Sequence, residues 1–335
     1  MHVTTVNPIL AESVRGDMVE NHYRGAFMVI NADGDVIKSV GDVNRLIYPR
    51  SSLKPMQALS LIESGAATAF KVSDEEIALA SASHGGEDHH VKIIDQWLKR
   101  LKLTPEVLEC GIHPPLHKES AHKLEHQGHK STPLHNACSG NHLAFITTCL
   151  HLKLPIEGYT HFDHPVQQRS FELISQITGF DVMTAPKGID GCQVPVVGMS
   201  LTSLALGMAR LSTFERLPPA LQLAAQRITN AMKKYPSLIA GTDRFCTRMG
   251  TLLNAAVLVK MGAEGVFSGI VPFQGWGLAL KIDDGNTTAA EVAMMGLLDS
   301  MKLIPEDKYA EFEPLRNPII KNFNHHPVGY FRFKS

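Results

Sequence analysis

Ser51 and Lys54 lie three residues apart in the sequence, directly before the apolar run 55–62. Residues at positions i and i+3 share one face of a helix, so this spacing would place a hydroxyl beside an amine. A serine hydroxyl becomes a good nucleophile when a neighbouring base takes its proton. A lysine can be that base when burial or a nearby cation lowers its pKa. The pattern is compatible with a serine nucleophile and a lysine base. Taken alone it favours an N-cap serine followed by a solvated lysine, because Ser and Lys are common and Ser is a preferred N-cap.

The composition argues against two classes of partner. The chain has 335 residues, of which 44% are hydrophobic and 19% charged, and its formal net charge is -1. No basic face is available to neutralise nucleic-acid phosphates. Clusters of Lys and Arg beside apolar stretches, which would favour a membrane surface, are also missing. We therefore expect a small-molecule substrate, no nucleic-acid partner and no membrane partner.

The N-terminal residues and the cysteines bear on localisation. Residues 1–8 lack the basic region and long apolar core of a signal peptide, and no apolar stretch is long enough for a membrane span. The five cysteines, at 110, 138, 149, 192 and 246, are odd in number and far apart. We therefore predict a reduced protein of the cytoplasm.

Histidines are concentrated in one part of the chain. Of 17 in total, seven lie between residues 113 and 142. A metal-binding tract is one interpretation. No H-E-x-x-H or C-x-x-C pattern occurs among them, so we favour a polar surface segment in which most of these histidines are solvated.

The coarse pattern of elements predicts an α+β fold. Strand-like runs occur at 25–30 and 36–40, joined by the turn signal Asp33-Gly34, and a second pair at 265–271 and 277–282. The segments between them are mostly helical in pattern, with an irregular stretch at 114–133. Helices are predicted around 55–62, 90–101, 143–152, 172–177, 196–211, 217–232, from about 246 through 258, and 289–301.

Strands near both ends of the chain enclose this helical middle, which favours an antiparallel sheet with strands from both termini. We predict one lobed catalytic unit over residues 1–335, with a sheet lobe at about 1–45 and 260–335 and a helical lobe at about 50–258. Two domains divided near 150–190 are the alternative, but no Pro/Gly/Ser-rich linker marks that boundary.

Six short polar clusters are separated by apolar structure. They are RSSLK (50–54), ASHGGE (82–87), CSGNH (138–142), GIDGC (188–192), AGTDRF (240–245) and KMGAEG (260–265). As a set they resemble the Rhizobium-type L-asparaginases, the asparaginase II-like amidohydrolase family. The resemblance covers nearly the whole chain in order and spacing, and this makes it much more specific than any single motif.

The resemblance implies a fold like that of serine β-lactamases and glutaminases, and hydrolysis of L-asparagine to L-aspartate and ammonia. It also implies a homodimer. Ser51 would be the nucleophile and Lys54 its base, with Ser83 as a second hydroxyl and Lys260 as a second amine. Two cations disfavour each other's protonation, so one lysine can be neutral near pH 7. Taken alone, Ser83 is also consistent with a loop residue bonded to backbone, and Lys260 with a solvated lysine.

By the same resemblance, Cys138 and Cys192 would be ligands of a zinc ion. Thiolates suit Zn²⁺, which prefers four ligands. The family pattern is C-S-G-K-H, in which the lysine is a third ligand, but Asn141 occupies that position here. His142 and Asp190 would surround the metal-bound water. Two buried free cysteines are the alternative.

A second departure concerns the motif after Arg244. The family commonly has Arg-Phe-Asp, and this chain has Cys246 in place of the acid, with Asp243 in place of a glycine. The loss of a carboxylate would alter recognition of the substrate's α-amino group or remove a structural ion pair. The two departures keep a slow, retuned or inactive family member among the alternatives.

Charge considerations suggest how a zwitterionic substrate would be held. Arg50 would face the α-carboxylate, and Glu87 or Asp190 the α-amine; a surface ion pair or a helix cap is the alternative for Arg50 and Glu87. Amide groups at the Ser51 helix start, or in the loop that contains His84, would stabilise the oxyanion, and we include His84 among the substrate-binding residues.

Two other functions are consistent with parts of the pattern. A penicillin-recognising enzyme uses S-x-x-K together with S-D-N and K-T-G, but no K-T-G occurs in this chain. A non-catalytic protein that binds a small amide or a metal would account for Asn141 and Cys246.

Overall fold

The fold is built on one antiparallel sheet that combines strands from both ends of the chain. The computed structural model describes residues 6–334; part of the segment used for the signal-peptide prediction, residues 1–5, lies outside it. The sheet has eight strands in the order β6-β7-β8-β2-β1-β10-β9, and β3 also pairs with β2. They are β1 (Ile9–Arg15), β2 (Met18–Asn31), β3 (Val36–Val40), β6 (Leu258–Gly262), β7 (Val266–Val271), β8 (Trp276–Ile282), β9 (Ile319–Lys321) and β10 (Pro327–Phe333).

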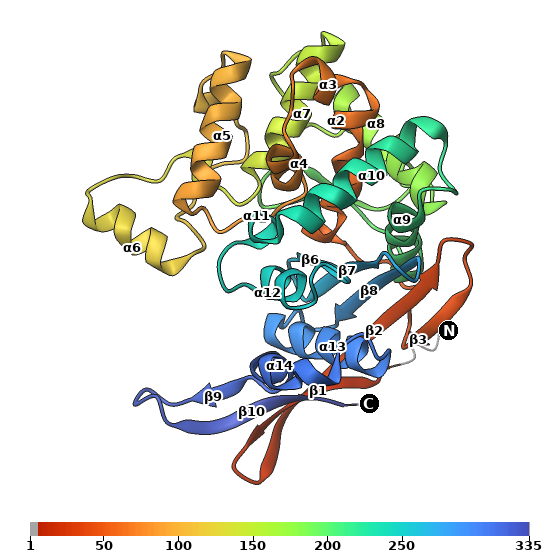
Figure 1. The fold of residues 1–335 in the computed structure, drawn as a ribbon, viewed down its shortest axis with the longest axis vertical. Coiled ribbons are helices and arrows are strands. Elements are labelled where there is room, and N and C mark those ends of the chain that lie inside the picture. The colour runs from red at the N-terminus through yellow and green to blue at the C-terminus, as the bar shows by residue number, and fades with distance from the viewer. Residues whose placement is uncertain (1–5, 335) are drawn as a thin grey trace.

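The long strand β2 joins the two halves of this sheet. Its first part pairs with β1, and its second part pairs with β8 from Gly25 to Asn31. Figure 1 shows the resulting curl, with β1, β9 and β10 turned away from β6, β7 and β8. The predicted α+β fold with strands from both termini is therefore confirmed.

Helices fill the middle of the chain. They are α1 (Lys54–Gln57), α2 (Leu59–Glu63), α3 (Ala66–Ala69), α4 (Asp74–Ala80), α5 (Asp88–Leu101), α6 (Lys118–His126), α7 (Ser139–Leu152), α8 (Pro165–Thr178), α9 (Leu201–Thr213), α10 (Pro219–Lys234), α11 (Pro236–Ala240), α12 (Phe245–Leu252), α13 (Thr287–Ser300) and α14 (Tyr309–Arg316). Short 3₁₀ turns are η1 (Arg50–Leu53), η2 (Pro105–Val107), η3 (Pro133–His135) and η4 (Glu306–Lys308), and β4 (Lys187–Ile189) and β5 (Pro195–Val197) form a separate ribbon.

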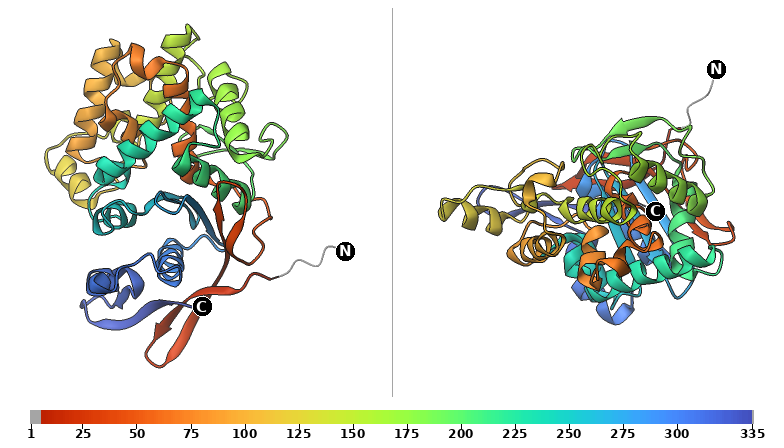
Figure 2. Two further views of the ribbon diagram at one scale, coloured as in Figure 1. Left: turned by 45° about the vertical axis from the view of Figure 1, so that its right-hand side comes forward. Right: turned by 90° about the horizontal axis from the view of Figure 1, so that it is seen from above.

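The helices cover the sheet on two sides. Helix α9 packs on β8, β2 and β7, whereas α13 contacts β10 and β1. Figure 2 shows most of the helices gathered above the sheet, whereas α13 and α14 lie within its curl, between β6–β8 and β9–β10. Helix α7 is apolar nearly all round and buried along most of its length, as expected for a helix inside a helical layer. One hydrophobic cluster extends from β1 through the helices to α14.

The structure corrects three predicted elements. The segment predicted as one helix at 196–211 begins as strand β5, because Val196 pairs with Gly188 of β4, and the helix starts only at Leu201. The helix predicted through 258 ends at Leu252, since Leu258 and Val259 pair with β7. The stretch at 114–133, predicted to be irregular, contains α6.

Two further outcomes concern the predicted organisation. The division into one lobed unit, rather than two domains, stays a prediction. No helix in the described part of the chain combines the length and apolar character needed to cross a membrane.

The contact between α9 and β8 depends on Gly277. A Cβ atom at this position would overlap the Ala205 carbonyl oxygen and the Ala209 amide nitrogen of α9. We therefore predict that Gly277→Ala lowers the free energy of unfolding by about 1–3 kcal/mol, because the helix must move off the strand. The matched control is Gly198→Ala, whose new Cβ would meet no atom closer than 3.5 Å. Urea denaturation of both variants tests this, and equal stabilities would contradict it.

Candidate active site

The turn that carries Ser51 is held in an unusual backbone conformation. Arg50, which opens η1, has a φ of 54°, a region that residues other than glycine rarely adopt. Strand β6 packs directly against this turn, since a Cβ atom on Gly262 would lie 2.5 Å from the Pro49 carbonyl oxygen. The glycine therefore allows β6, and with it Lys260, to approach the residue predicted to be the nucleophile.

Ser51 and Lys54 line one narrow cavity. Asn141, Asp190 and Cys192 line it as well, so residues from three of the six predicted clusters meet there. Within the cavity, the centre of a water molecule can occupy a volume of about 10 Å³. This is roughly the space that one water molecule needs. The predicted nucleophile and base therefore share a confined space with groups from distant parts of the chain.

The Lys54 amine extends from this cavity to the second predicted hydroxyl. Its Nζ donates to the Ala82 carbonyl at 2.7 Å and contacts Ser83 Oγ at 3.2 Å. From the other side, Lys260 Nζ lies 2.9 Å from Ser83 Oγ and donates to the Met261 carbonyl at 2.7 Å. The Ser83 hydroxyl thus bridges two amines that are 3% and 1% exposed.

Burial sets the protonation of this group. Loss of solvent, together with the nearby Lys54 charge, lowers the pKa of Lys260 to about 7. A hydroxyl has one proton to donate and lone pairs to accept with. With Lys260 neutral, Ser83 can donate to that amine while it accepts from the Lys54 ammonium. The three groups then form a continuous path along which a proton can move.

An ion pair forms one wall of the cavity. Arg50 Nη2 donates to Asp190 Oδ1 at 2.8 Å, and both side chains are largely shielded from solvent. Burial opposes ionisation of Asp190, but the Arg50 hydrogen bond and charge outweigh it and lower the pKa of the carboxyl. The two residues predicted to hold a zwitterion therefore pair with each other in this structure.

Neither His84 nor Glu87 lines this cavity. His84 is fully buried, with Nδ1 accepting from the Gly86 amide and Nε2 2.9 Å from Ser139 Oγ; burial lowers the pKa of its ring well below the ordinary value. The Glu87 carboxylate accepts from the backbone and the hydroxyl of Thr242. Their predicted contacts with substrate remain predictions, and this geometry lends them no support.

The two predicted metal ligands affect each other's ionisation. A hydrogen bond from the Cys192 thiol lowers the pKa of Cys138, and Lys54 adds to the effect; the same hydrogen bond, with burial, raises the pKa of Cys192. Cys138 is thus the thiol with the greater tendency to ionise.

A complete set of zinc ligands is not present around these thiols. Within residues 6–334, no group of three or more His, Cys, Asp and Glu ligand atoms that lie within 4.8 Å of one another includes either thiol. Asn141 donates Nδ2 to the Ala80 carbonyl, and its Oδ1 is buried without a partner in the described structure. His142 is fully buried, not solvated, and holds Tyr159 Oη at 2.5 Å from Nδ1. Two thiols and one amide oxygen fall short of the four ligands that zinc prefers, so the residues do not fit a closed zinc site.

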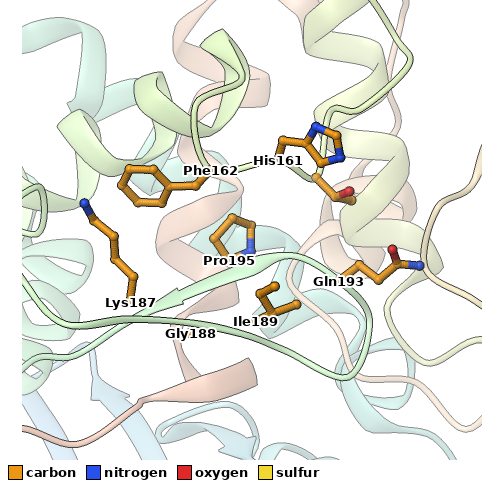
Figure 3. Close-up of a pocket in the computed structure, with 8 residues that line it drawn as sticks. His161, Phe162, Lys187, Gly188, Ile189, Gln193 and Pro195 are labelled. Carbon is orange, nitrogen blue, oxygen red and sulfur yellow. The ribbon is translucent and has the colours of Figure 1, made fainter.

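A larger cavity, of about 600 Å³, lies on the outer side of the β4–β5 ribbon. Figure 3 shows Ile189 and Pro195 at its centre, with Lys187 directed toward the ring of Phe162. The Lys187 Nζ lies 4.0 Å from that ring's centroid. Neither of the predicted serine–lysine pairs lines this cavity, so the smaller one is the candidate active site.

Comparison with known proteins assigns the chain to a family whose model spans all six polar clusters. The family model described as L-asparaginase II matches residues 11–333. The chain belongs to the L-asparaginase II family. Membership supports amidohydrolase chemistry in general. Among curated proteins, none matches this family member significantly.

Solved structures similar to this family member are distant in sequence. The native form of Mglu has 16% identity and a TM-score of 0.48 over 85% of this chain and 66% of its own. Its glutamate form has 14% identity and a TM-score of 0.46 over 85% and 62%. A β-lactamase from Mycobacterium bovis has 10% identity and a TM-score of 0.44 over 82% and 94%. The chain thus spans less than two thirds of either Mglu chain.

Sequence reasoning missed one residue that holds the site together. Arg244 Nη1 donates to the Ser83 carbonyl at 2.9 Å and to the Ala240 carbonyl at 3.3 Å. The presence of Arg244 in the polar cluster 240–245 was the signal that could have marked it as a candidate site residue. No local sequence pattern connects that cluster with residue 83, so its contact with Ser83 could not be predicted.

Replacing Lys260 should stabilise the protein while removing the second amine. At pH 7 the unfolded lysine is fully protonated, whereas burial opposes protonation in the folded state. We predict that Lys260→Met raises the free energy of unfolding by on the order of 3 kcal/mol at pH 7. The unfolded state binds more protons between pH 7 and the ordinary lysine value of 10.5, so wild-type stability rises through that window and the difference shrinks. Urea denaturation at several pH values measures it; equal stability at pH 7 would show an unperturbed lysine.

The third ligand position should determine zinc affinity. We predict that the wild-type protein binds zinc weakly and that Asn141→Lys binds it at least about tenfold more tightly, because an amine replaces an amide oxygen beside the two thiols. Competition with a chromogenic chelator measures both affinities. Asn324→Lys, at an exposed turn, is the matched control. Wild-type binding as tight as that of the variant would contradict the prediction.

Proposed function

We propose that this protein hydrolyses the side-chain amide of L-asparagine to L-aspartate and ammonia through an acyl-enzyme on Ser51. The family match supports an amide substrate. The observation that carries the proposal is the cavity that Ser51 and Lys54 both line. Lys54 is hydrogen-bonded to the Ser83 hydroxyl that Lys260 contacts. Such an arrangement supplies a nucleophile and a route for its proton.

The Arg50–Asp190 pair supports a zwitterionic substrate. An α-carboxylate would replace Asp190 on the Arg50 guanidinium, and the freed Asp190 carboxylate would take the α-ammonium. The exchange replaces one ion pair with two, which offsets the cost of separating the two side chains. Because the cavity has room for only about one water, entry of the substrate also requires the loop that carries Asp190 to move.

The chemical steps follow from the positions of the two lysines. Ser51 Oγ attacks the amide carbon while Lys54 accepts its proton, and the same proton is then delivered to the departing ammonia. Water hydrolyses the resulting ester in a second half-reaction and releases aspartate. Lys54 must be neutral to begin, and the hydrogen bonds through Ser83 connect its amine to that of Lys260, which gives its proton a route out of the cavity.

A binding protein without turnover is the second candidate. The small size of the cavity and the unpartnered Asn141 Oδ1 favour it. Ligand binding without ammonia release would identify it. The homodimer, the cytoplasmic location and a zinc cofactor stay predictions.

Removal of the nucleophile tests the proposal. We predict that Ser51→Ala lowers the rate of ammonia release from L-asparagine by at least about a thousandfold, because no other hydroxyl shares the cavity with Lys54 among the described residues. A coupled ammonia assay over asparagine, glutamine and related amides measures it. Ser39→Ala, on exposed strand β3, is the matched control and should keep wild-type activity. Unchanged release in the Ser51 variant would overturn the assignment.

A further inference from the structure

A second polar cavity, of about 310 Å³, lies behind the strand that carries Lys260. It is formed by α12, α13, α14 and β6, which lie together in Figure 1. Arg244, Arg248, Asp243 and Glu291 line it, and Met261 contributes to its apolar part. The cavity therefore brings two guanidinium groups and two carboxyl groups into one space, at the lower end of the size range of small-molecule sites.

These charged groups are not used to neutralise each other. In the part of the chain that the structure describes, no ion pair within 4.0 Å involves Arg248, Asp243 or Glu291. The hydrogen bonds of Arg244 run from Nη1 to two backbone carbonyls. Both guanidinium groups thus retain donors for a ligand, and half-buried Glu291 retains its acceptors.

We propose that this cavity binds a small α-amino acid, with its carboxylate between Arg244 and Arg248 and its ammonium group at Glu291. Guanidinium groups are suited to carboxylates because their paired donors match the two oxygens. A buried carboxyl is in turn suited to an ammonium group, since opposite charge compensates for lost solvent. The mixture of charges favours a zwitterion over a simple anion or a simple amine.

The protonation of Glu291 agrees with such a ligand. Burial raises the pKa of this carboxyl to about 7, and the Arg244 and Arg248 charges oppose that rise. Asp243 and the buried Cys246 thiol are the other titratable groups that line the cavity. Near neutral pH the carboxyl is therefore partly protonated, and an ammonium group beside it would favour the ionised form. Binding should then release a proton.

The cavity is connected to the catalytic groups through Arg244. The guanidinium that would meet the ligand also donates to the Ser83 carbonyl at 2.9 Å, so a ligand that competes for it would change the support of Ser83. The effect on catalysis rests on the proposed function, in which the product, aspartate, is itself a small α-amino acid. Binding of an amino acid in this cavity does not depend on the proposed function.

A local probe can detect binding in the full-length protein. We predict that the methyl resonance of Met261, in protein labelled with [methyl-¹³C]methionine and assigned with Met261→Leu, shifts saturably with glycine and with L-aspartate. Arg248→Gln should weaken this binding at least about tenfold, and Glu311→Gln, at an exposed position of α14, should leave it unchanged. Acetate and methylammonium, each with only one of the two charges, should bind at least about tenfold more weakly than glycine.

Calorimetry in two buffers of different ionisation enthalpy tests the proton release. We predict release on glycine binding at pH 7 in the wild-type protein and none in Glu291→Gln. A Met261 resonance that does not move, acetate binding as tight as glycine binding, or unchanged affinity in Arg248→Gln would each overturn the proposal. A protein that fails to release ammonia but shows the Met261 shift would retain this site and lose only the proposed reaction.

Discussion

Two lysine amines buried against one serine hydroxyl are the interaction on which the rest of the site depends. Lys54 and Lys260 are almost fully buried; each donates to a backbone carbonyl and lies within hydrogen-bond distance of the Ser83 hydroxyl. Like charges this close cannot both be kept at low cost, so the fold holds one amine in a state that readily loses its proton. Burying a charged amine costs free energy, and the packing of the surrounding core must offset that cost for the protein to remain folded.

The three groups come from separate elements, and the backbone contacts around them determine their meeting. Lys54 begins α1, Ser83 follows α4, and Lys260 lies on β6. Gly262 lets β6 approach the turn at Ser51, and Arg244 fixes the Ser83 carbonyl from α12's N-terminal side. The arrangement of the three groups therefore depends on how the helical part of the chain packs against the sheet.

The sequence predicted those parts of the protein that depend on local patterns. The 265–271 and 277–282 strands form an antiparallel pair, and the Asp33-Gly34 turn joins β2 to β3, because alternation and turn residues act over a few positions. Strands β1, β9 and β10 were not predicted: β9 has three residues, and β10 is matched mainly to β1 at the far end of the chain. Proximity of Lys260 to Ser83 was available only from the family resemblance, since 177 residues separate them. The substrate contacts of His84 and Glu87 stay predictions; the structure places both side chains outside the cavity and bonds them to Ser139, Gly86 and Thr242.

The pairing of β1 with β10 also has a consequence for the order of folding during synthesis. Strand β10 leaves the ribosome after every other described strand, so the sheet cannot close until residues 327–333 have been made. The helical middle, with its many local contacts, can form earlier, whereas such long-range pairing is slow. A nascent chain therefore carries Ser51 and Lys54 well before Lys260, and the link from Lys54 through Ser83 to Lys260 forms only once β6 is in place.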